Sequence, residues 1–568
     1  MTAMDGIRTI EADVAVVGAG AAGARAALAA AEAGARVALL SKGPLARSGI
    51  TITAAGGMQA LLHPDDSPEK YVADVLACGY DLADANLVRV LAEDSPARIA
   101  DLERYGAAFQ RQAGGGYDLR RFPGHSVPRN VFIRGGGSGL IGTLRNACLA
   151  NPGIAVHEDF YAAGLVPRAD GSPAPAGVVG LDLKSGEICF VGAGAVVLAT
   201  GGCQRLWEIN DCPADATGDG LAMAYRAGAE LIDMEMVLFY PSVIVWPPSL
   251  RGAFVHYEFL APEFLDGEIL DRDGRPVLPK PLPVRDVAMR LMAEAIAAGR
   301  GGEHGGLFWW AGEGPKSAAG QAALNTAQYK YIRQHGVEPL TDKIEVAPGA
   351  HYLLGGIGID AQGATSVPGL FATPECAGNI DGANRLAGSA LMATQVFGCR
   401  AGQAAQAWAL AHGAAPPERE ELAAEVGRLK GKVAKEAAGG GETAAESASL
   451  TEVRSYLRAA VQQGAGVRRD AAGLGALLRA VAEAEEALAW LKVPDIRVYN
   501  QQLVDLLELE AACTVARLVA GSALKREESR GHHFRADFPA RDDGQWLRHT
   551  TVRRGETGPE FGSRPVIR

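Results

Sequence analysis

Three glycines near the amino terminus have the spacing of a loop that binds a dinucleotide. Gly18, Gly20 and Gly23 follow a short β-branched run, residues 11–17, and precede an alanine-rich helix. The first glycine would permit a tight turn, the second would let the backbone approach a pyrophosphate, and the third would let the helix pack on the strand. The free N–H groups at the helix start would face the phosphates. The residues predicted to hold a nucleotide here are Gly18, Gly20, Ala21, Ala22 and Gly23.

The strand after this helix ends without the acidic residue that is typical of nicotinamide sites. Residues 36–41 are expected to form the second buried strand of a βαβ unit. An Asp or Glu is expected about 20 residues after the glycine loop, but Ser41 and Lys42 stand there. A hydroxyl and an ammonium would therefore hold the ribose, which is unusual for a nicotinamide-binding protein.

The composition is that of a globular chain with an excess of glycine. Of the 568 residues, 48% are hydrophobic and 21% are charged, and this length is enough for several domains. The 72 glycines indicate repeated close approach of the backbone to a flat or phosphorylated group. The formal net charge of −11 provides no domain-wide basic surface, so we expect no nucleic-acid partner.

The eight cysteines are spaced singly, without a C-x-x-C pair. This argues against a zinc site, an iron–sulfur cluster and a disulfide framework, so we expect no metal site in the chain itself. No charge-free run has the length of a membrane span, and the first residues lack the apolar stretch of a signal peptide. We expect a cytoplasmic protein, or one held at the cytoplasmic face of a membrane through partner subunits.

The composition and the expected secondary structure change several times along the chain. Further strands are expected at residues 178–183 and 193–202, and helices fill much of residues 448–527. Residues from 521 on carry an excess of basic side chains. We expect this segment to fold back on the acidic body of the chain, with docking on an acidic neighbour as the alternative. The predicted units are residues 1–244 continued by 341–412, an insertion at 245–340, a helical domain at 413–540 and a tail at 541–568.

Several motifs follow one another in the order seen in one flavoprotein family. They are Ser41-Lys42, AAGG at 54–57, ATGG at 199–202, TGDG at 217–220, AHYLLGG at 350–356, GLFATPECAG at 369–378, DGANRLAGSAL at 381–391 and ESRGHHFRADFPARDDGQWL near the carboxyl end. Through them the chain resembles the flavoprotein subunit family of succinate dehydrogenase and fumarate reductase, which includes L-aspartate oxidase and the adenylylsulfate reductase α subunit. The resemblance covers almost the whole chain. It implies an α/β fold: a Rossmann-like FAD-binding domain, an inserted α+β capping domain and a C-terminal helical domain.

The resemblance also implies a bound FAD and the residues around it. By family motif, Ser41 and Lys42 meet the adenosine ribose, and Glu375 binds the ribitol or ribose region. Thr200 and Asp219 support the nucleotide half. The other residues expected at the cofactor are Ser48, Thr51, Ala55, Gly56, Gly57, Ala199, Gly201, Tyr352, Arg385, Ala390 and Leu391, of which Arg385, Ala390 and Leu391 would lie beside the flavin.

The segment that carries a covalent flavin link in respiratory members of the family is altered. Those members attach FAD through a histidine in a segment like RSHTVAAQGG, whereas residues 47–57 here read RSGITITAAGG. Without a nucleophilic imidazole we predict non-covalent, dissociable FAD. Loss of the link is expected to lower the flavin potential, which favours reduction of substrates or oxidation by O₂ over oxidation of succinate.

Hydride transfer to an activated alkene needs a clamp for carboxylates, polarisation of the double bond and a proton donor. The resemblance makes Arg285, in R-D-V-x-x-R, the proton shuttle, with Asp286 and Glu258 as candidate relays. Arg285 is expected to stand just before a helix N-terminus, whose partial positive charge would disfavour its cation. His351 and Arg385 match the substrate clamp. A surface arginine at a helix start and a histidine satisfied in the core are the alternative interpretations.

Two departures from the family pattern concern the second carboxylate. Tyr240 replaces a substrate-binding histidine, and the segment T-E-G-x-R-G-E-G-G is replaced by FVHYEFLAPEFLDG at 254–267. A phenol carries no charge at neutral pH, so a dicarboxylate would be held less well. A monocarboxylate, a bulkier unsaturated acid or an amino acid would suit an aromatic wall, unless these rings are core packing of the cap. The residues of that wall are Phe239, Tyr240, Trp246, His256 and Tyr257.

The sequence thus predicts an FAD-dependent oxidoreductase that exchanges a hydride between flavin N5 and a carbon α or β to a carboxylate. Fumarate and succinate, or a close relative, are the first candidates for the substrate. One alternative is an L-aspartate-oxidase-like flavin oxidase or dehydrogenase. Another is an electron-transfer subunit that passes electrons to an iron–sulfur partner, with the basic final segment at the interface. A non-catalytic flavin-binding scaffold is the least specific alternative.

Overall fold

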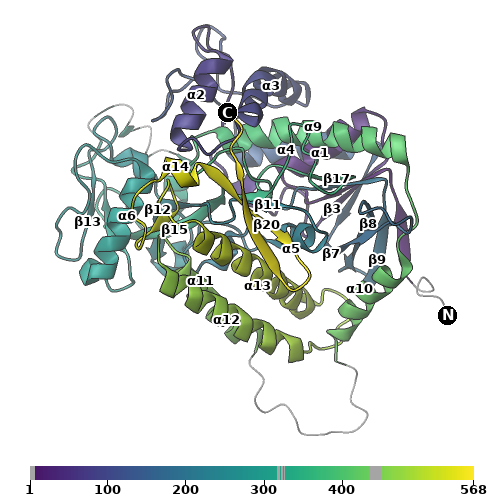
Figure 1. Ribbon diagram of the computed structural model, residues 1–568. Coiled ribbons are helices and arrows are strands. Elements are labelled where there is room, and N and C mark those ends of the chain that lie inside the picture. Colours follow the sequence, from purple (N-terminus) through teal and green to yellow (C-terminus); the bar gives the residue numbers. More distant parts are fainter. Residues whose placement is uncertain (1–6, 316, 318–319, 322–323, 325, 435–448) are drawn as a thin grey trace.

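The glycine loop lies at the carboxyl edge of a parallel sheet, in a computed structural model that describes residues 7–568 except 316, 318–319, 322–323, 325 and 435–448 (Figure 1). Parts of the predicted first, inserted and helical units therefore lie outside the described residues. The sheet has the strand order β17-β10-β2-β3-β6, and all its neighbours are parallel. Its strands are β2 (Val14–Val17), β3 (Val37–Ser41), β6 (Ile154–Glu158), β10 (Ala195–Leu198) and β17 (Leu370–Ala372). β3 and β10 confirm two of the predicted strands.

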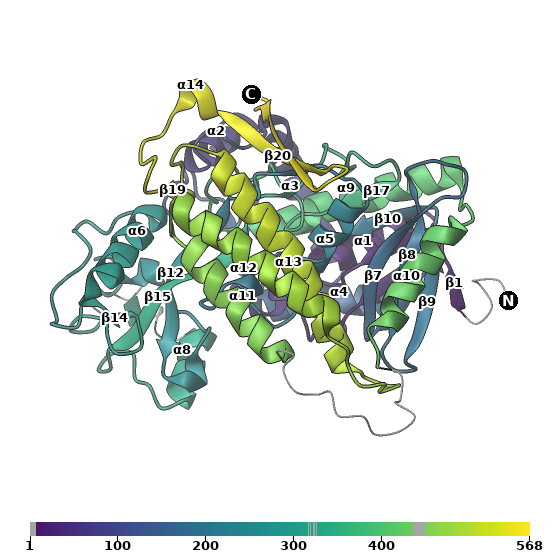
Figure 2. The ribbon, with the colours of Figure 1, turned by 60° about the horizontal axis from the view of Figure 1, so that its bottom comes forward.

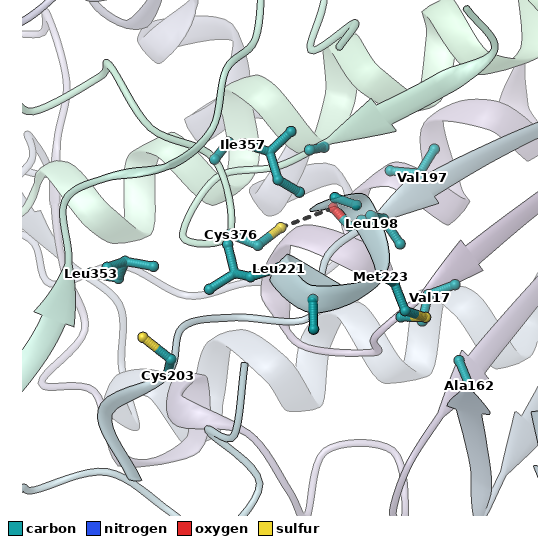
Figure 3. Packing of buried hydrophobic residues seen from close by; sticks show 14 of the residues in the cluster. Val17, Ala162, Val197, Leu198, Cys203, Leu221, Met223, Leu353, Ile357 and Cys376 are labelled. Carbon is teal, nitrogen blue, oxygen red and sulfur yellow. Dashed lines mark hydrogen bonds between the residues drawn. The ribbon is translucent and has the colours of Figure 1, made fainter. Parts of the chain in front are cut away.

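Two helices pack closely against each other beside this sheet. They are α1 (Ala21–Glu32), which follows the glycine loop, and the long helix α9 (Ser389–His412). The close approach depends on small residues, because a Cβ atom at Gly402 of α9 would lie 2.2 Å from the carbonyl oxygen of Ala26. Figure 3 shows the other side of β10, where Leu198 lies near Leu221, and where the Cys376 thiol donates to the Leu198 carbonyl at 3.2 Å. None of the eight cysteines forms a disulfide.

A separate antiparallel sheet, at the left of Figure 1, has a core of its own. Its strand order is β12-β15-β14-β13, and the helices α6 and α8 belong to the same region. These elements are β12 (Val237–Trp246), β13 (Glu268–Leu270), α6 (Arg285–Ala295), β14 (Leu307–Trp310), α8 (Ala327–Gln334) and β15 (Ile344–Leu353). The long strands β12 and β15 extend beyond residues 245–340 at both ends and connect this region to the parallel sheet. The domain boundaries given above remain a proposal.

Long helices from the C-terminal part of the chain lie across the molecule in Figure 2. Of these, α13 is buried along most of its length. The last strands join β11 and β16 in a sheet of order β16-β11-β20-β21. The prediction that the basic final segment folds back is therefore confirmed, and Arg553 and Arg564 both pair with Glu230. The elements are α10 (Arg419–Gly431), α11 (Leu450–Gly464), α12 (Ala471–Trp490), α13 (Gln501–Lys525), α14 (Asp543–Trp546), β20 (Arg548–Arg554), β21 (Pro559–Pro565), β11 (Leu231–Ile232) and β16 (Gly356–Ile357).

The remaining elements complete the two larger regions. A second sheet of order β1-β9-β8-β7 lies beside the parallel one, and its strand β8 confirms the strand predicted at 178–183. The elements are β1 (Arg8–Glu11), η1 (Ile50–Thr53), β4 (Gly57–Gln59), α2 (Pro68–Cys78), α3 (Ala85–Arg104), β5 (Asn130–Phe132), α4 (Gly136–Ala150), β7 (Phe160–Pro167), β8 (Pro175–Asp182), β9 (Glu187–Gly192), η2 (Gln204–Leu206), α5 (Asp219–Arg226), η3 (Pro248–Leu250), η4 (Tyr257–Leu260), η5 (Ile296–Arg300), β18 (Arg468–Arg469) and β19 (Phe534–Arg535). No helix among the described residues is both long and apolar enough to cross a membrane.

A fully buried arginine ties the C-terminal part of the chain to the segment after β11. Arg526 donates to the carboxylates of Asp233 (3.2 Å), Glu235 (2.6 Å) and Glu528 (3.0 Å). It also donates to the carbonyl oxygens of Trp546 and Arg548. All five guanidinium N–H groups thus have acceptors, which is the condition for burying this charge.

We predict that Arg526→Lys lowers the free energy of unfolding by about 3–5 kcal/mol, because three ammonium protons cannot satisfy these acceptors. Urea unfolding of the purified holoprotein measures this difference. The matched control is Arg553→Lys, whose side chain is 59% exposed in its pair with Glu230, and which should change the free energy by less than about 1 kcal/mol. Equal effects of the two substitutions would contradict the prediction.

Candidate functional site

A long cleft opens where the glycine loop, β3, β7 and the loop after β17 meet. The space between its walls, which is partly open to solvent, is about 940 Å³, and predicted and unpredicted residues alike line it. The predicted residues that line it are Gly18, Gly20, Ala21, Ala22, Ser41, Lys42, Ser48, Thr51, Ala199, Thr200, Gly201, Asp219 and Glu375. The structure thus brings together most of the residues expected at a dinucleotide, although they come from four separate parts of the sequence.

The glycine loop has the geometry that a nucleotide cradle requires. Gly18 has a φ of +102°, and a Cβ atom there would lie 2.3 Å from the Ala199 carbonyl oxygen. A Cβ atom at Gly23 would lie 1.8 Å from the Gly18 carbonyl oxygen, so neither position tolerates a side chain. The helix α1 begins directly at the cleft, where its first N–H groups favour a phosphate. The Ala21 N–H donates to Thr51 Oγ1 at 3.1 Å, which accounts for one of them.

A half-buried lysine organises the wall at the end of β3. Lys42 Nζ lies 2.8 Å from both Asp219 Oδ2 and Glu508 Oε1, and 2.9 Å from Thr217 Oγ1. Burial opposes its charge, but the two carboxylates outweigh this and raise the pKa of Lys42. The ammonium donors are therefore engaged by the protein, and Ser41 Oγ donates to the Gly43 carbonyl at 2.6 Å. Contact of Ser41 and Lys42 with a ribose stays a prediction.

On the opposite wall of the cleft, Glu375 and Thr200 present groups suited to sugar hydroxyls. Burial raises the pKa of Glu375 to about 7, and Gln204 Nε2 donates to its Oε1 at 2.6 Å. Thr200 Oγ1 is buried without a hydrogen-bond partner among the described residues. A Cβ atom at Gly220 would lie 2.0 Å from this oxygen, which explains the glycine in TGDG. An unpaired hydroxyl and a buried carboxyl in one cleft fit the hydroxyl-rich chain of FAD.

A second group of side chains adjoins this cleft through Gln204. Arg285, the first residue of α6, donates from Nε to Glu258 Oε1 in η4. Glu258 Oε2 accepts from the Tyr240 hydroxyl at 2.9 Å, and the Arg285 guanidinium lies 5.0 Å from the centre of the Tyr240 ring. Burial disfavours the Arg285 cation, but Glu258 more than offsets this and the pKa of Arg285 is raised. The expectation that the helix start would disfavour the cation is therefore wrong, because Glu258 pairs with it.

A histidine on β15 and a second arginine, from the segment before α9, lie beside Tyr240. His351 Nδ1 lies 2.7 Å from Asp211 Oδ2, and its Nε2 lies 3.4 Å from Arg385 Nη2. The His351 ring is 5.4 Å from the Tyr240 ring. The Arg385 guanidinium stacks over the Tyr352 ring at 4.1 Å, and its buried Nε has no hydrogen-bond partner among the described residues. Two guanidiniums, an imidazole and two carboxylates thus form one continuous cluster.

Backbone pairing explains how these distant residues meet. Tyr240 on β12 is in register with Gly349 on β15, two residues before His351. Asn210 forms a parallel bridge with Ala350, which places Asp211 beside the imidazole. The Gln204 amide, which binds Glu375 in the cleft, also donates to the His351 carbonyl at 3.4 Å. The cluster therefore lies where the antiparallel sheet and the nucleotide cleft meet.

Other predicted residues lie apart from the cleft or the cluster. Asp286 is next to Arg285, but its Oδ2 accepts from the Tyr80 hydroxyl, and only Glu258 of the two predicted relays is bonded to the guanidinium. Phe239 packs against Trp207 in the core, and Trp246 stacks on His304 at 3.9 Å near the surface. The predicted residues outside the cleft lining are Gly23, Ala55, Gly56, Gly57, Tyr352, Arg385, Ala390 and Leu391. Their contacts with a flavin stay a prediction.

Sequence reasoning missed several residues that shape the site. Asp211 lies far from His351 in sequence, and no spacing pattern connects them. His532, in the HH pair near the carboxyl end, lies 3.0 Å from Asn384 Oδ1, and burial together with Arg285 and His351 lowers its pKa well below the usual value. Phe254 contacts Tyr240 and His351. The unusual His-His pair and the aromatic content of residues 254–259 were the available signals.

Comparison with known proteins agrees with this geometry over the whole chain. Residues 13–391 match the FAD binding domain family, and residues 454–568 match the fumarate reductase flavoprotein C-terminal family. A fumarate reductase (CoM/CoB) subunit of Methanothermobacter marburgensis is 34% identical, over 97% of this chain and 98% of that protein. The L-aspartate oxidase of Caulobacter vibrioides is 35% identical, over 93% of each chain. The E. coli quinol fumarate reductase FrdA structure superposes with a TM-score of 0.87 at 29% identity, over 99% of this chain and 98% of that one.

The fold and the site thus define an FAD-dependent oxidoreductase with a nucleotide cleft beside a cluster of cationic side chains. The chain belongs to the fumarate reductase and succinate dehydrogenase flavoprotein family.

We predict that Lys42→Met weakens FAD binding and destabilises the protein by about 3 kcal/mol, because two buried carboxylates lose their common cation. Thermal unfolding and the FAD dissociation constant measure the two effects. The double variant Lys42→Met with Glu508→Gln should recover part of both losses, since it removes one unpaired charge. No recovery in the double variant would contradict the proposed charge balance.

Proposed function

We propose that this oxidoreductase adds or removes hydrogen across the carbon–carbon bond of an acid, with fumarate and succinate defining the substrate class. The observation that supports this best is the continuous cluster Arg285–Glu258–Tyr240–His351–Arg385, which combines a proton donor with a carboxylate clamp. FAD, when bound, accepts or supplies the hydride. The residues that would hold it are those that line the cleft.

In this proposal, Arg385 and His351 hold a substrate carboxylate. A carboxylate can only accept, so Asp211 accepts the Nδ1 proton of His351, and the imidazolium form of His351 would donate to the substrate carboxylate from Nε2, which lies 3.4 Å from Arg385 Nη2. The Arg385 guanidinium carbon lies 4.1 Å from the centre of the Tyr352 ring, and its Nε has no hydrogen-bond partner among the described residues, so the group would have donors for two parallel hydrogen bonds to a carboxylate. Orientation of the acid by this pair would bring its double bond to a fixed position.

Arg285 would give a proton to one carbon of the double bond, and Glu258 would pass a new proton from water to Arg285. The guanidinium keeps its charge in the resting site because Glu258 is bonded to it. After donation, a proton would return to Arg285 along its hydrogen bond with Glu258, whose other oxygen is held by the Tyr240 hydroxyl. In the opposite direction the same pair would remove a proton from the saturated acid.

The second candidate function is oxidation of an amino acid at its C–N bond, as in L-aspartate oxidase. The identity to the Caulobacter vibrioides enzyme favours it. The carboxylate clamp would serve both reactions. An oxidase would release imino acid and consume O₂, whereas the preferred reaction would reduce an unsaturated acid anaerobically.

We further propose an iron–sulfur electron-transfer partner and a cytoplasmic location, free or at a membrane face. Similarity to fumarate reductase flavoprotein subunits, such as that of Mycobacterium tuberculosis at 32% identity, supports the partner. The basic final segment, suggested as an interface, is partly engaged within the chain through Glu230. Co-purification of a stoichiometric, cysteine-rich brown chain would support a partner, and a lone active chain with a soluble donor would oppose it.

We predict that Arg285→Lys lowers the rate of acid reduction by about 10²–10⁴-fold, because the shorter ammonium keeps the charge but misplaces the proton. FAD content should be unchanged. Photoreduced enzyme, reoxidised anaerobically with fumarate and other unsaturated acids, measures the rate. Arg290→Lys, one turn further along α6, is the control and should stay within about twofold. Retention of the wild-type rate in Arg285→Lys would refute the proton-donor role.

We predict that FAD is released completely by acid precipitation. The described lining of the cleft contains no histidine or cysteine side chain that could form a covalent flavin bond. The absorbance of the supernatant and pellet near the flavin band measures the partition. Yellow colour retained by the washed pellet would show a covalent link and overturn this prediction.

A further inference from the structure

The structure distinguishes the two ends of the substrate that this site would hold. We infer that the site takes an acid with a single carboxylate, bound by Arg385 and His351, and with an uncharged and preferably aromatic group at the far end of its double bond. The inference rests on the proposed function and narrows its substrate class. It follows from three observations on charge, hydrogen-bond donors and ring contacts.

The first observation is the charge balance of the cluster. Arg285 is paired with Glu258, and His351 is paired with Asp211 at 2.7 Å. Among the described residues, Arg385 has no carboxylate within ion-pair distance. Its positive charge is therefore available to pair with a substrate carboxylate. The two carboxyl groups nearest to Arg385 in the sequence have other partners. Asp381 accepts from Ser389 Oγ at 2.6 Å, and Glu375 accepts from Gln204. One uncompensated cation balances one carboxylate.

The second observation concerns the hydroxyls that face the far end. Tyr240 and Tyr257 are buried, and each phenol has one proton to donate. The Tyr240 hydroxyl donates to Glu258 Oε2 at 2.9 Å and accepts from the Tyr257 backbone N–H at 3.1 Å. The Tyr257 hydroxyl donates to the Pro283 carbonyl at 2.7 Å. Both protons are therefore committed, and these two phenols offer no donor to a second carboxylate.

The third observation is the surface that continues from Tyr240. The ring of Phe254 lies 5.1 Å from Tyr240 and 5.3 Å from His256, and His256 lies 4.5 Å from Phe259. Burial lowers the pKa of His256 to about 4, so this ring is neutral at pH 7. Phe254, His256 and Phe259 are each only partly buried. A stretch of neutral rings attracts an aryl group edge-to-face, whereas the negative face of a ring repels a carboxylate.

The reaction is balanced with such an acid. The double bond gains a hydride from reduced FAD at one carbon and a proton from Arg285 at the other, and becomes a single bond. The carboxylate is unchanged, and Arg285 regains a proton that is taken from water and passed on by Glu258. The two electrons come from FAD that has been reduced beforehand.

The test compares saturated acids as ligands of the oxidised, FAD-loaded protein. Dissociation constants for 3-phenylpropanoate, butanoate and succinate are measured from the shift of the flavin absorption band. We expect 3-phenylpropanoate to bind at least about tenfold tighter than succinate. The second carboxylate of succinate would find neither a cation nor a charge-assisted hydrogen bond at the end of the site away from Arg385. Succinate binding as tightly as 3-phenylpropanoate would overturn the inference. Turnover of photoreduced protein with cinnamate, crotonate and fumarate should give the same order.

Two variants test whether the hydroxyls of Tyr240 and Tyr257 leave no donor for a second carboxylate. Tyr240→His with Tyr257→Thr should shift the binding ratio toward succinate by about tenfold or more, since it restores a chargeable group and a free hydroxyl. Tyr331→His, on the exposed face of α8, is the control and should leave the ratio unchanged. Tyr240→Phe removes only the hydroxyl and should also leave the ratio unchanged, even where the double variant does not fold. A selective loss of succinate binding in Tyr240→Phe would overturn the inference.

The two proposals fail in different ways. Preference for succinate and fumarate over the aryl acids would overturn this inference and leave the proposed function intact. An FAD-loaded protein that neither binds nor reduces any acid of the panel would overturn the proposed function. In that case release of an imino acid from amino acids would support the second candidate function.

Discussion

The chemistry of this protein depends on how the positive charges near the flavin site are paired. Three cationic or chargeable groups, Arg285, His351 and Arg385, are brought into one partly buried cluster, where an unpaired charge is costly. Glu258 and Asp211 compensate two of them. The third is stabilised by the face of Tyr352. This leaves a single cation with spare hydrogen-bond donors, and a carboxylate is the natural ligand to complete it.

The fold accounts for why this cluster forms at the junction of its regions. The FAD-binding region supplies the nucleotide cleft and Arg385, which precedes α9. The region of the antiparallel sheet supplies Tyr240 and the helix that begins with Arg285. The Tyr80–Asp286 hydrogen bond and the contact of His532 with Met289 connect α6 to other parts of the chain. The C-terminal segment thus contributes to the position of the helix that begins with Arg285, the proposed proton donor, although it lies far from this helix in sequence.

The sequence predicted the parts of this structure that local geometry determines. The glycine loop, the strands at β3 and β10 and the basic final segment follow from spacing, burial pattern and charge, and family motifs added Arg285, His351 and Arg385. Contacts between residues that are distant in the sequence could not be predicted from it. Asp211 reaches His351 only because Asn210 bridges to Ala350, and Lys42 meets Glu508 of a helix near the other end of the chain. The raised pKa of Arg285 was missed for the same reason, since a neighbouring carboxylate outweighs a helix terminus.

In the proposed function the two arginines divide the work: Arg385 would hold the carboxylate and Arg285 would supply the proton. The most direct measurement is the dissociation constant of 3-phenylpropanoate for FAD-loaded Arg385→Lys and Arg285→Lys, read from the flavin absorption band. This division predicts that Arg385→Lys weakens binding by about tenfold or more, because the paired hydrogen bonds of the guanidinium are lost. Arg285→Lys should bind the acid within a few-fold of the unaltered protein. Equal loss of binding in both variants, or loss only in Arg285→Lys, would contradict it.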